Sequence, residues 1–206
     1  MDHAQTQPQD QFDVLVVGAG PAGLMAAEQA ARAGMRVAVA EAMPSPARKS
    51  LMAGKSGLNL TKAEQSNAFL QNFDAIAALK PILSQFGPAE VIGFAEALGQ
   101  EVFTGSTGRI FPTCMKASPL LRAWLARLDA LGVVLLRRHR WTGPLITDAQ
   151  HLFDTPKGKV TFRAGALILA LGGASWARLG SDGAWHMPFA AAGMPINSFK
   201  ASNVGM

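Results

Sequence analysis

The feature that most constrains this chain is an apolar run that leads directly into a glycine-rich turn and then into strong helix formers. Residues 14–17 (Val-Leu-Val-Val) precede residues 18–23 (Gly-Ala-Gly-Pro-Ala-Gly), and residues 24–33 favour a helix. Residues 35–40 form a second apolar run, which ends at Glu41. The order of strand, turn, helix and strand predicts one βαβ unit.

Each glycine of this turn has its own physical role. Gly18 lets the chain turn sharply out of the strand, Gly20 lets backbone approach a pyrophosphate, and Gly23 lets the helix pack closely on the strand. Pro21 and Ala22 open the helix, whose first N–H groups and partial positive charge suit phosphate. The turn therefore predicts a dinucleotide-binding site.

Glu41 strengthens this prediction because of its position. It lies 23 residues after Gly18, at the tip of the second strand. A carboxylate there can accept hydrogen bonds from ribose hydroxyls, and it disfavours a 2′-phosphate. The alternative is a glycine-rich turn in an ordinary α/β protein, with Glu41 exposed to solvent.

Composition excludes several classes of protein. Of 206 residues, 49% are hydrophobic and 16% charged, which fits an α/β domain and argues against disorder. No apolar stretch is long enough to span a membrane, and the polar residues 1–11 predict a disordered tail without a signal sequence. We therefore expect a cytoplasmic protein that does not enter membranes.

Charge and cysteine content narrow the possible partners. The net charge is +5, but the cations are scattered apart from residues 137–140, so an anionic cofactor or substrate explains them better than nucleic acid. Cys114 is the single cysteine, which excludes an intrachain disulfide and a thiolate metal cluster. We expect neither a metal site nor nucleic-acid binding.

Residues 42–62 form a connection that is too long for a structural turn. It holds two glycines and four cations, and we interpret it as a loop that wraps a cofactor. Arg48 and Lys49 can neutralise phosphate, while Asn59 and Thr61 can donate hydrogen bonds to a ribose or phosphate. The alternative is an exposed basic loop.

The rest of the chain alternates helix and strand signals, without an internal repeat. The expected elements are helices at 63–80, at 81–87 (opened by Pro81) and at 89–98; a hairpin at 100–112; a helix with Ser118 as N-cap and Pro119 at its first position, ending at Gly132; a buried parallel strand at 133–136; an antiparallel β-meander at 143–163 with turns at Pro144, Asp148 and 157–158; a buried strand at 165–171 that ends in Gly172 and Gly173; and a helix at 184–192.

Several segments together resemble the BaiN-like or aminoacetone-oxidase-like FAD-binding flavoproteins, which have two dinucleotide-binding domains. The resemblance covers nearly all of residues 12–195. The segments that carry it are 18–24, 54–61 (Gly-Lys-Ser-Gly-Leu-Asn-Leu-Thr), 108–112 (Gly-Arg-Ile-Phe-Pro), 118–121 and 171–175 (Leu-Gly-Gly-Ala-Ser). Two positions depart from the pattern: Leu171 replaces a threonine, and residues 57–59 replace Arg-Cys-Asn.

The resemblance implies an α/β fold with a Rossmann-like FAD-binding three-layer core, a parallel sheet and a small antiparallel β-meander, incomplete at its C-terminus. These flavoproteins are about twice as long as this chain and carry an inserted substrate domain. We therefore expect a disordered tail at 1–11, an FAD/NAD(P)-binding Rossmann-like domain at 12–195, and the start of the inserted domain at 196–206.

The function that the resemblance implies is an FAD-dependent oxidoreductase that uses NAD(P)H or dioxygen as redox partner for an unknown small molecule. One alternative is a non-catalytic nucleotide-binding fragment, and a weaker one is an NAD-only dehydrogenase. The expected cofactor-binding residues are Gly18, Gly20, Pro21, Ala22, Gly23, Glu41, Arg48, Gly54, Gly57, Asn59, Thr61, Gly172 and Gly173.

No residue is assigned a catalytic role, and the oligomeric state stays open. Arg109 can bind a reduced flavin or an acidic substrate, but a surface cation beside a hairpin turn is the favoured interpretation. Cys114 has no cysteine partner, so we expect a core or neutral thiol. His186 is expected to be packed or to face solvent.

Overall fold

A computed structural model describes residues 11–73, 76–143 and 150–200, and the chain divides into two compact units. The first unit combines Met1–Lys49 with Leu128–Met206, and the second consists of Ser50–Arg127. Gln11, at the end of the expected tail, already belongs to a strand, while residues 1–10 and 201–206 lie outside the described residues.

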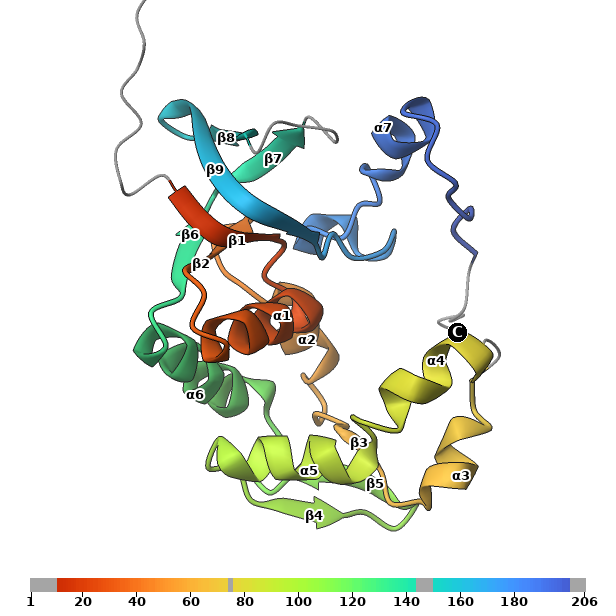
Figure 1. Cartoon of the computed structure of the whole chain (residues 1–206). Coiled ribbons are helices and arrows are strands. Elements are labelled where there is room, and N and C mark those ends of the chain that lie inside the picture. Colours follow the sequence, from red (N-terminus) through yellow and green to blue (C-terminus); the bar gives the residue numbers. More distant parts are fainter. Residues whose placement is uncertain (1–10, 74–75, 144–149, 201–206) are drawn as a thin grey trace, which may run out of the picture. The chain divides into compact units, whose positions relative to one another are not determined.

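The first unit is built on a six-stranded, mostly parallel sheet with the spatial order β6-β2-β1-β9-β8-β7 (Figure 1). β1, β2, β6 and the end of β9 run parallel, while β7, β8 and the start of β9 run antiparallel. The bounds are β1 Gln11–Val17, β2 Val37–Glu41, β6 Val134–Arg137, β7 Arg140–Gly143, β8 Gln150–Thr155 and β9 Gly158–Leu169. This arrangement confirms the predicted Rossmann-type α/β fold.

β9 corrects one prediction about the meander. The last meander strand and the strand expected at 165–171 are a single long strand, drawn in Figure 1 as one curved arrow. Its first half pairs with β8 up to Arg163, and its second half pairs with β1 from Arg163 to Leu169. The meander is therefore hydrogen-bonded into the parallel sheet. The turns predicted at Pro144 and Asp148 lie outside the described residues.

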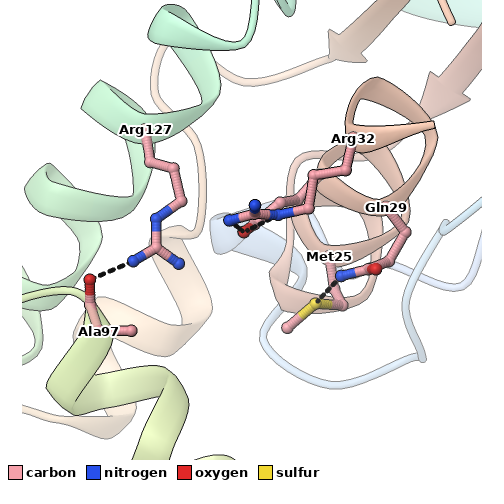
Figure 2. Close-up of polar contacts among 6 residues, drawn as sticks. Met25, Gln29, Arg32, Ala97 and Arg127 are labelled. Atoms are coloured by element: carbon pink, nitrogen blue, oxygen red, sulfur yellow. Dashed lines mark hydrogen bonds and ion pairs between the residues drawn. The ribbon is translucent and has the colours of Figure 1, made fainter. Parts of the chain in front are cut away.

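Helix α1 (Pro21–Arg32) and the meander pack on opposite faces of the parallel strands. Val16 reaches toward the helix, because its Cγ1 lies 3.2 Å from the position of a Cβ added at Gly23. Leu15, which points to the other face, belongs to an apolar cluster with Phe153 of β8 and Phe162 of β9. On the helix itself, the Gln29 amide donates to the sulfur of Met25 at 3.5 Å (Figure 2).

Two strands expected to be buried are partly exposed. Val134 of β6 is 43% exposed, because β6 is the last strand at its end of the sheet. Leu169 of β9 is 36% exposed, and beyond Arg163 this strand pairs only with β1 among the described residues. An apolar run alone does not reveal whether a strand has neighbours on both sides.

The second unit contains a three-stranded antiparallel sheet, ordered β3-β5-β4, and several short helices (Figure 1). The bounds of the elements over residues 48–130 are α2 Arg48–Ala53, β3 Thr61–Lys62, α3 Ser66–Leu70, α4 Ile76–Leu83, α5 Pro88–Ala97, β4 Val102–Thr104, β5 Arg109–Pro112 and α6 Ala117–Ala130. The hairpin predicted at 100–112 is confirmed as β4 and β5. Arg127 of α6 donates a hydrogen bond to the carbonyl of Ala97 (Figure 2).

Three local predictions in residues 42–130 are wrong. The long connection at 42–62 contains α2 and β3, because its helix formers and its pairing with β5 give it regular structure. The helix expected at 63–80 is two helices, and Pro81 lies inside α4 instead of opening a new helix. Because α4 ends two residues later, the hydrogen bond that Pro81 cannot donate belongs to its last turn. α6 begins at Ala117, so Ser118 is in its first turn instead of at the N-cap.

No helix among the described residues is long and apolar enough to cross a membrane.

Candidate functional site

The glycine-rich turn joins β1 to α1, and two of its glycines are required by close backbone contacts. Gly18 has φ +103°, and its N–H donates to the Ala40 carbonyl at 2.8 Å. A Cβ on Gly18 would lie 2.3 Å from the Ala170 carbonyl oxygen, and one on Gly23 would lie 1.9 Å from that of Gly18. The packing of the helix and strands therefore requires glycine at both positions, as the spacing predicts.

Gly20 differs from its two neighbours because open space surrounds it. A Cβ added there would have no atom within 4 Å, and its φ of −78° suits any residue. It is the N-cap of α1, whose described neighbours provide no side-chain cap, and the first turn of the helix has no acidic residue. The partial positive charge of this helix end is thus accessible to an anion.

Glu41 lies beside the turn, at the end of β2. Its Oε2 accepts a hydrogen bond from the Ala19 N–H at 3.0 Å, and its Oε1 accepts one from the Met43 N–H at 2.7 Å. The carboxylate is partly exposed, and each oxygen retains a further lone pair. The side chain therefore faces the turn, where the sequence predicts it.

Arg48 follows a segment that returns to the same turn. The Ala47 N–H donates to the Ala19 carbonyl at 2.9 Å, and Nη1 of Arg48 donates to Oγ of Ser45 at 3.4 Å. Nε of Arg48 is buried and has no hydrogen-bond partner among the described residues. A buried guanidinium N–H without a partner is costly, so this atom fits an anionic ligand group.

The second glycine pair, Gly172 and Gly173, follows β9. The hydroxyl of Ser181 donates to the Gly173 carbonyl at 2.9 Å, and the indole N–H of Trp185 donates to that of Gly172 at 3.0 Å. A Cβ on Gly172 would meet the Ser181 hydroxyl at 3.2 Å, whereas one on Gly173 would meet nothing within 4 Å. Packing explains Gly172, and only Gly173 offers open backbone.

One further contact in the first unit, between Lys49 and Ser175, could not be predicted from the sequence. Nζ of Lys49 donates to the hydroxyl of Ser175, which follows the glycine pair. The two residues are 126 positions apart, so only the fold brings them together.

Four expected binding residues, Gly54, Gly57, Asn59 and Thr61, belong to the second unit. A Cβ on Gly54 would lie 2.7 Å from that of Ala117. Gly57 has φ +145°, and its Cβ would lie 2.7 Å from the Met115 side chain. Packing within the unit explains both glycines.

The remaining two residues of this group have different surroundings. Asn59 is exposed, and Thr61 pairs with Ile110 in the small sheet.

The three side chains weighed for other chemistry have simple surroundings. Arg109 is exposed on β5, and Cys114 is also exposed, so of the two expected possibilities, a core thiol or a neutral thiol, the core position is wrong. His186 packs against the rings of Trp185 and Phe199. Within residues 11–73, 76–143 and 150–200, no three His, Cys, Asp or Glu side chains form a group that can hold a metal ion.

Comparison with known proteins identifies a matching family and several similar folds. Residues 12–203 match the family described as "HI0933-like protein Rossmann domain". No curated protein matches the sequence.

Three solved structures illustrate the similarity of fold. A flavocytochrome c3 fumarate reductase in its open conformation has a TM-score of 0.64 at 18% identity over 81% of this chain and 34% of its own. The FrdA subunit of E. coli quinol fumarate reductase has a TM-score of 0.63 at 18% identity (80% and 33%). The 3-ketosteroid-delta4-(5alpha)-dehydrogenase from Rhodococcus jostii RHA1 has a TM-score of 0.52 at 17% identity (82% and 47%). The chain thus spans about a third to a half of the length of these proteins.

Proposed function

This chain belongs to the HI0933-like protein Rossmann domain family, and from that premise we propose that it is the FAD-binding part of a flavoprotein oxidoreductase. The structural neighbours, two fumarate reductases and a ketosteroid dehydrogenase, are redox enzymes by name, which supports a redox function. The resemblance to BaiN-like or aminoacetone-oxidase-like flavoproteins supports the same proposal.

The single observation that carries the proposal is the open backbone at Gly20, beside the uncapped end of α1. We propose that the diphosphate of FAD binds there, because helix N–H groups and a partial positive charge favour a phosphate. The unpartnered Nε of Arg48 adds a cation for the same group. Glu41 is proposed to accept hydrogen bonds from the ribose hydroxyls through its remaining lone pairs.

Bound FAD would supply the electron-transfer chemistry. The protein's part is to hold and orient the cofactor, and NAD(P)H or dioxygen is the proposed redox partner. Gly173 is proposed as a further contact to the cofactor.

The experiment compares the purified 206-residue chain with two matched variants. We expect the parent to take up FAD, seen as flavin absorption bands and as saturable binding by calorimetry. Gly20→Leu fills the space at the turn and abolishes binding by steric block. Gly93→Leu is the control, because Gly93 is an exposed glycine of α5 whose Cβ would also meet nothing within 4 Å. FAD binding by folded Gly20→Leu at the parent's affinity would refute the site.

The two alternatives predict different results in the same experiment. A non-catalytic fragment is colourless and monodisperse, and it binds FAD weakly or not at all. An NAD-only dehydrogenase binds NADH more tightly than FAD when the two are titrated separately.

A further inference from the structure

We propose that Trp176, Arg178 and Lys49 form a second ligand surface, which binds a planar aromatic compound carrying an anionic group. The three residues belong to the first unit and are exposed. This inference does not depend on FAD binding at the glycine-rich turn.

Trp176 is the centre of this surface because of its backbone and its exposure. Its φ of 65° and ψ of 55° lie in the left-handed region, which bulky side chains seldom adopt. The side chain is nevertheless 50% exposed, so burial of the indole does not explain the conformation. Non-glycine residues in this backbone region cluster at active sites and ligand-binding sites.

One cation lies against the indole, and a second contacts the residue that precedes it. The guanidinium carbon of Arg178 lies 5.4 Å from the centroid of the Trp176 ring. The ammonium group of Lys49 donates a hydrogen bond to the hydroxyl of Ser175, the residue immediately before Trp176. Neither cation forms an ion pair within the part of the chain that the structure describes, so their charge is not neutralised by a carboxylate there.

The chemistry of these groups defines the ligand. An exposed indole stacks on planar rings and tolerates many of them, because every aromatic ring offers a π-face. Two cations without carboxylate partners favour an anion such as a phosphate or carboxylate. The combination selects a compound with both parts over one with either part alone.

The location supports this proposal. Trp176 follows the C-terminal end of β9, which runs parallel to β1. In open parallel sheets, ligands bind outside the carboxyl ends of the strands. An aromatic anion at Trp176 would therefore lie at the functional edge of the sheet.

The test uses the full chain labelled with 5-fluorotryptophan and 1-naphthyl phosphate as the probe. The chain has four tryptophans, and the ¹⁹F signal absent from Trp176→Phe identifies the residue of interest. We expect that signal to shift saturably with the probe. Cyclohexyl phosphate, which lacks the aromatic ring, and 1-naphthol, which lacks the phosphate, should bind at least about tenfold more weakly.

Three variants separate binding from folding. Arg178→Ala combined with Lys49→Ala should weaken binding of the probe by about tenfold or more, while Arg178→Lys keeps the charge and most of the affinity. Trp176→Gly should fold, because glycine adopts this φ without strain, yet lose binding of the probe, which calorimetry measures in this variant because it lacks the Trp176 signal. The remaining ¹⁹F signals report that each variant stays folded.

The proposal is overturned by any of three results: a Trp176 signal that does not move, equal binding of cyclohexyl phosphate, or unchanged affinity in the double alanine variant. The probe binds at the glycine-rich turn instead if saturating FAD abolishes the shift of the Trp176 signal and also moves other tryptophan signals. That result would overturn the proposal too. Failure of FAD to bind leaves the titration readable, so the two proposals fail independently.

Discussion

Replacing Gly23 by alanine tests the close approach of α1 to β1 most directly. The added Cβ would lie 1.9 Å from the Gly18 carbonyl oxygen, whereas real Cβ atoms essentially never come closer than 3.0 Å. The helix must therefore move away from the strand by about 1 Å, and close-packed interiors resist such shifts. Leu24 of α1 must move with the helix, away from Val16 of β1, and both side chains are almost fully buried.

The expected cost is the balance of two terms. Overpacking of this kind costs about 1–3 kcal/mol. The better helix propensity of alanine stabilises the folded protein by up to about 1 kcal/mol, and by less near a helix end. We expect Gly23→Ala to lower the free energy of unfolding by about 2 kcal/mol, measured by urea denaturation followed by circular dichroism.

Gly20→Ala is the matched control, three residues earlier in the same turn. Its Cβ meets nothing within 4 Å, so only the poorer N-cap propensity of alanine acts, and its unfolding free energy should fall by no more than about 1 kcal/mol, clearly less than that of Gly23→Ala. The reasoning is refuted if Gly23→Ala is as stable as the parent, or if Gly20→Ala loses as much stability as Gly23→Ala.

Three further predictions concern other residues. Glu41→Ala should lower the free energy of unfolding by about 2 kcal/mol, because two backbone N–H groups lose a charged acceptor. Glu41→Gln should lose less stability, because it keeps one acceptor oxygen. Equal urea midpoints for the parent and both variants would contradict this prediction. Burial lowers the pKa of His151 below 6.5, so the free energy of unfolding is highest above pH 6.5 and falls as the pH drops below that value. His151→Phe should therefore flatten the dependence of the urea midpoint on pH. An unchanged slope would contradict this prediction. Gly54→Ala should destabilise the protein by about 1–3 kcal/mol, and adding Ala117→Gly should restore part of the loss in a double-mutant cycle, whereas strict additivity would show that the two sites do not touch.

The βαβ unit was predictable because its signals are local. The apolar runs, the glycine spacing and Glu41 all lie within about thirty residues, and each follows from backbone geometry and helix electrostatics. The structure adds the partners: Glu41 accepts from Ala19 and Met43, and Gly18 lies against Ala170.

The errors arise where distant parts of the chain decide the outcome. The alternating pattern of β9 cannot show that its partner changes from β8 to β1 at Arg163. The exposure of Val134 depends on the order of strands in the sheet, and the contact of Lys49 with Ser175 depends on the whole fold. Such facts have no signature in a window of ten or twenty residues.

The pairing of β1 with β9 has a consequence for how the chain folds during synthesis. Leu15 is bonded into the sheet opposite Leu167, so most of the chain must leave the ribosome before β1 gains this neighbour. Until then one edge of an apolar strand is unprotected, which slows folding and invites association between nascent chains. Pauses in translation between β2 and β9 should therefore increase aggregation, and chaperones that shield nascent strands should reduce it.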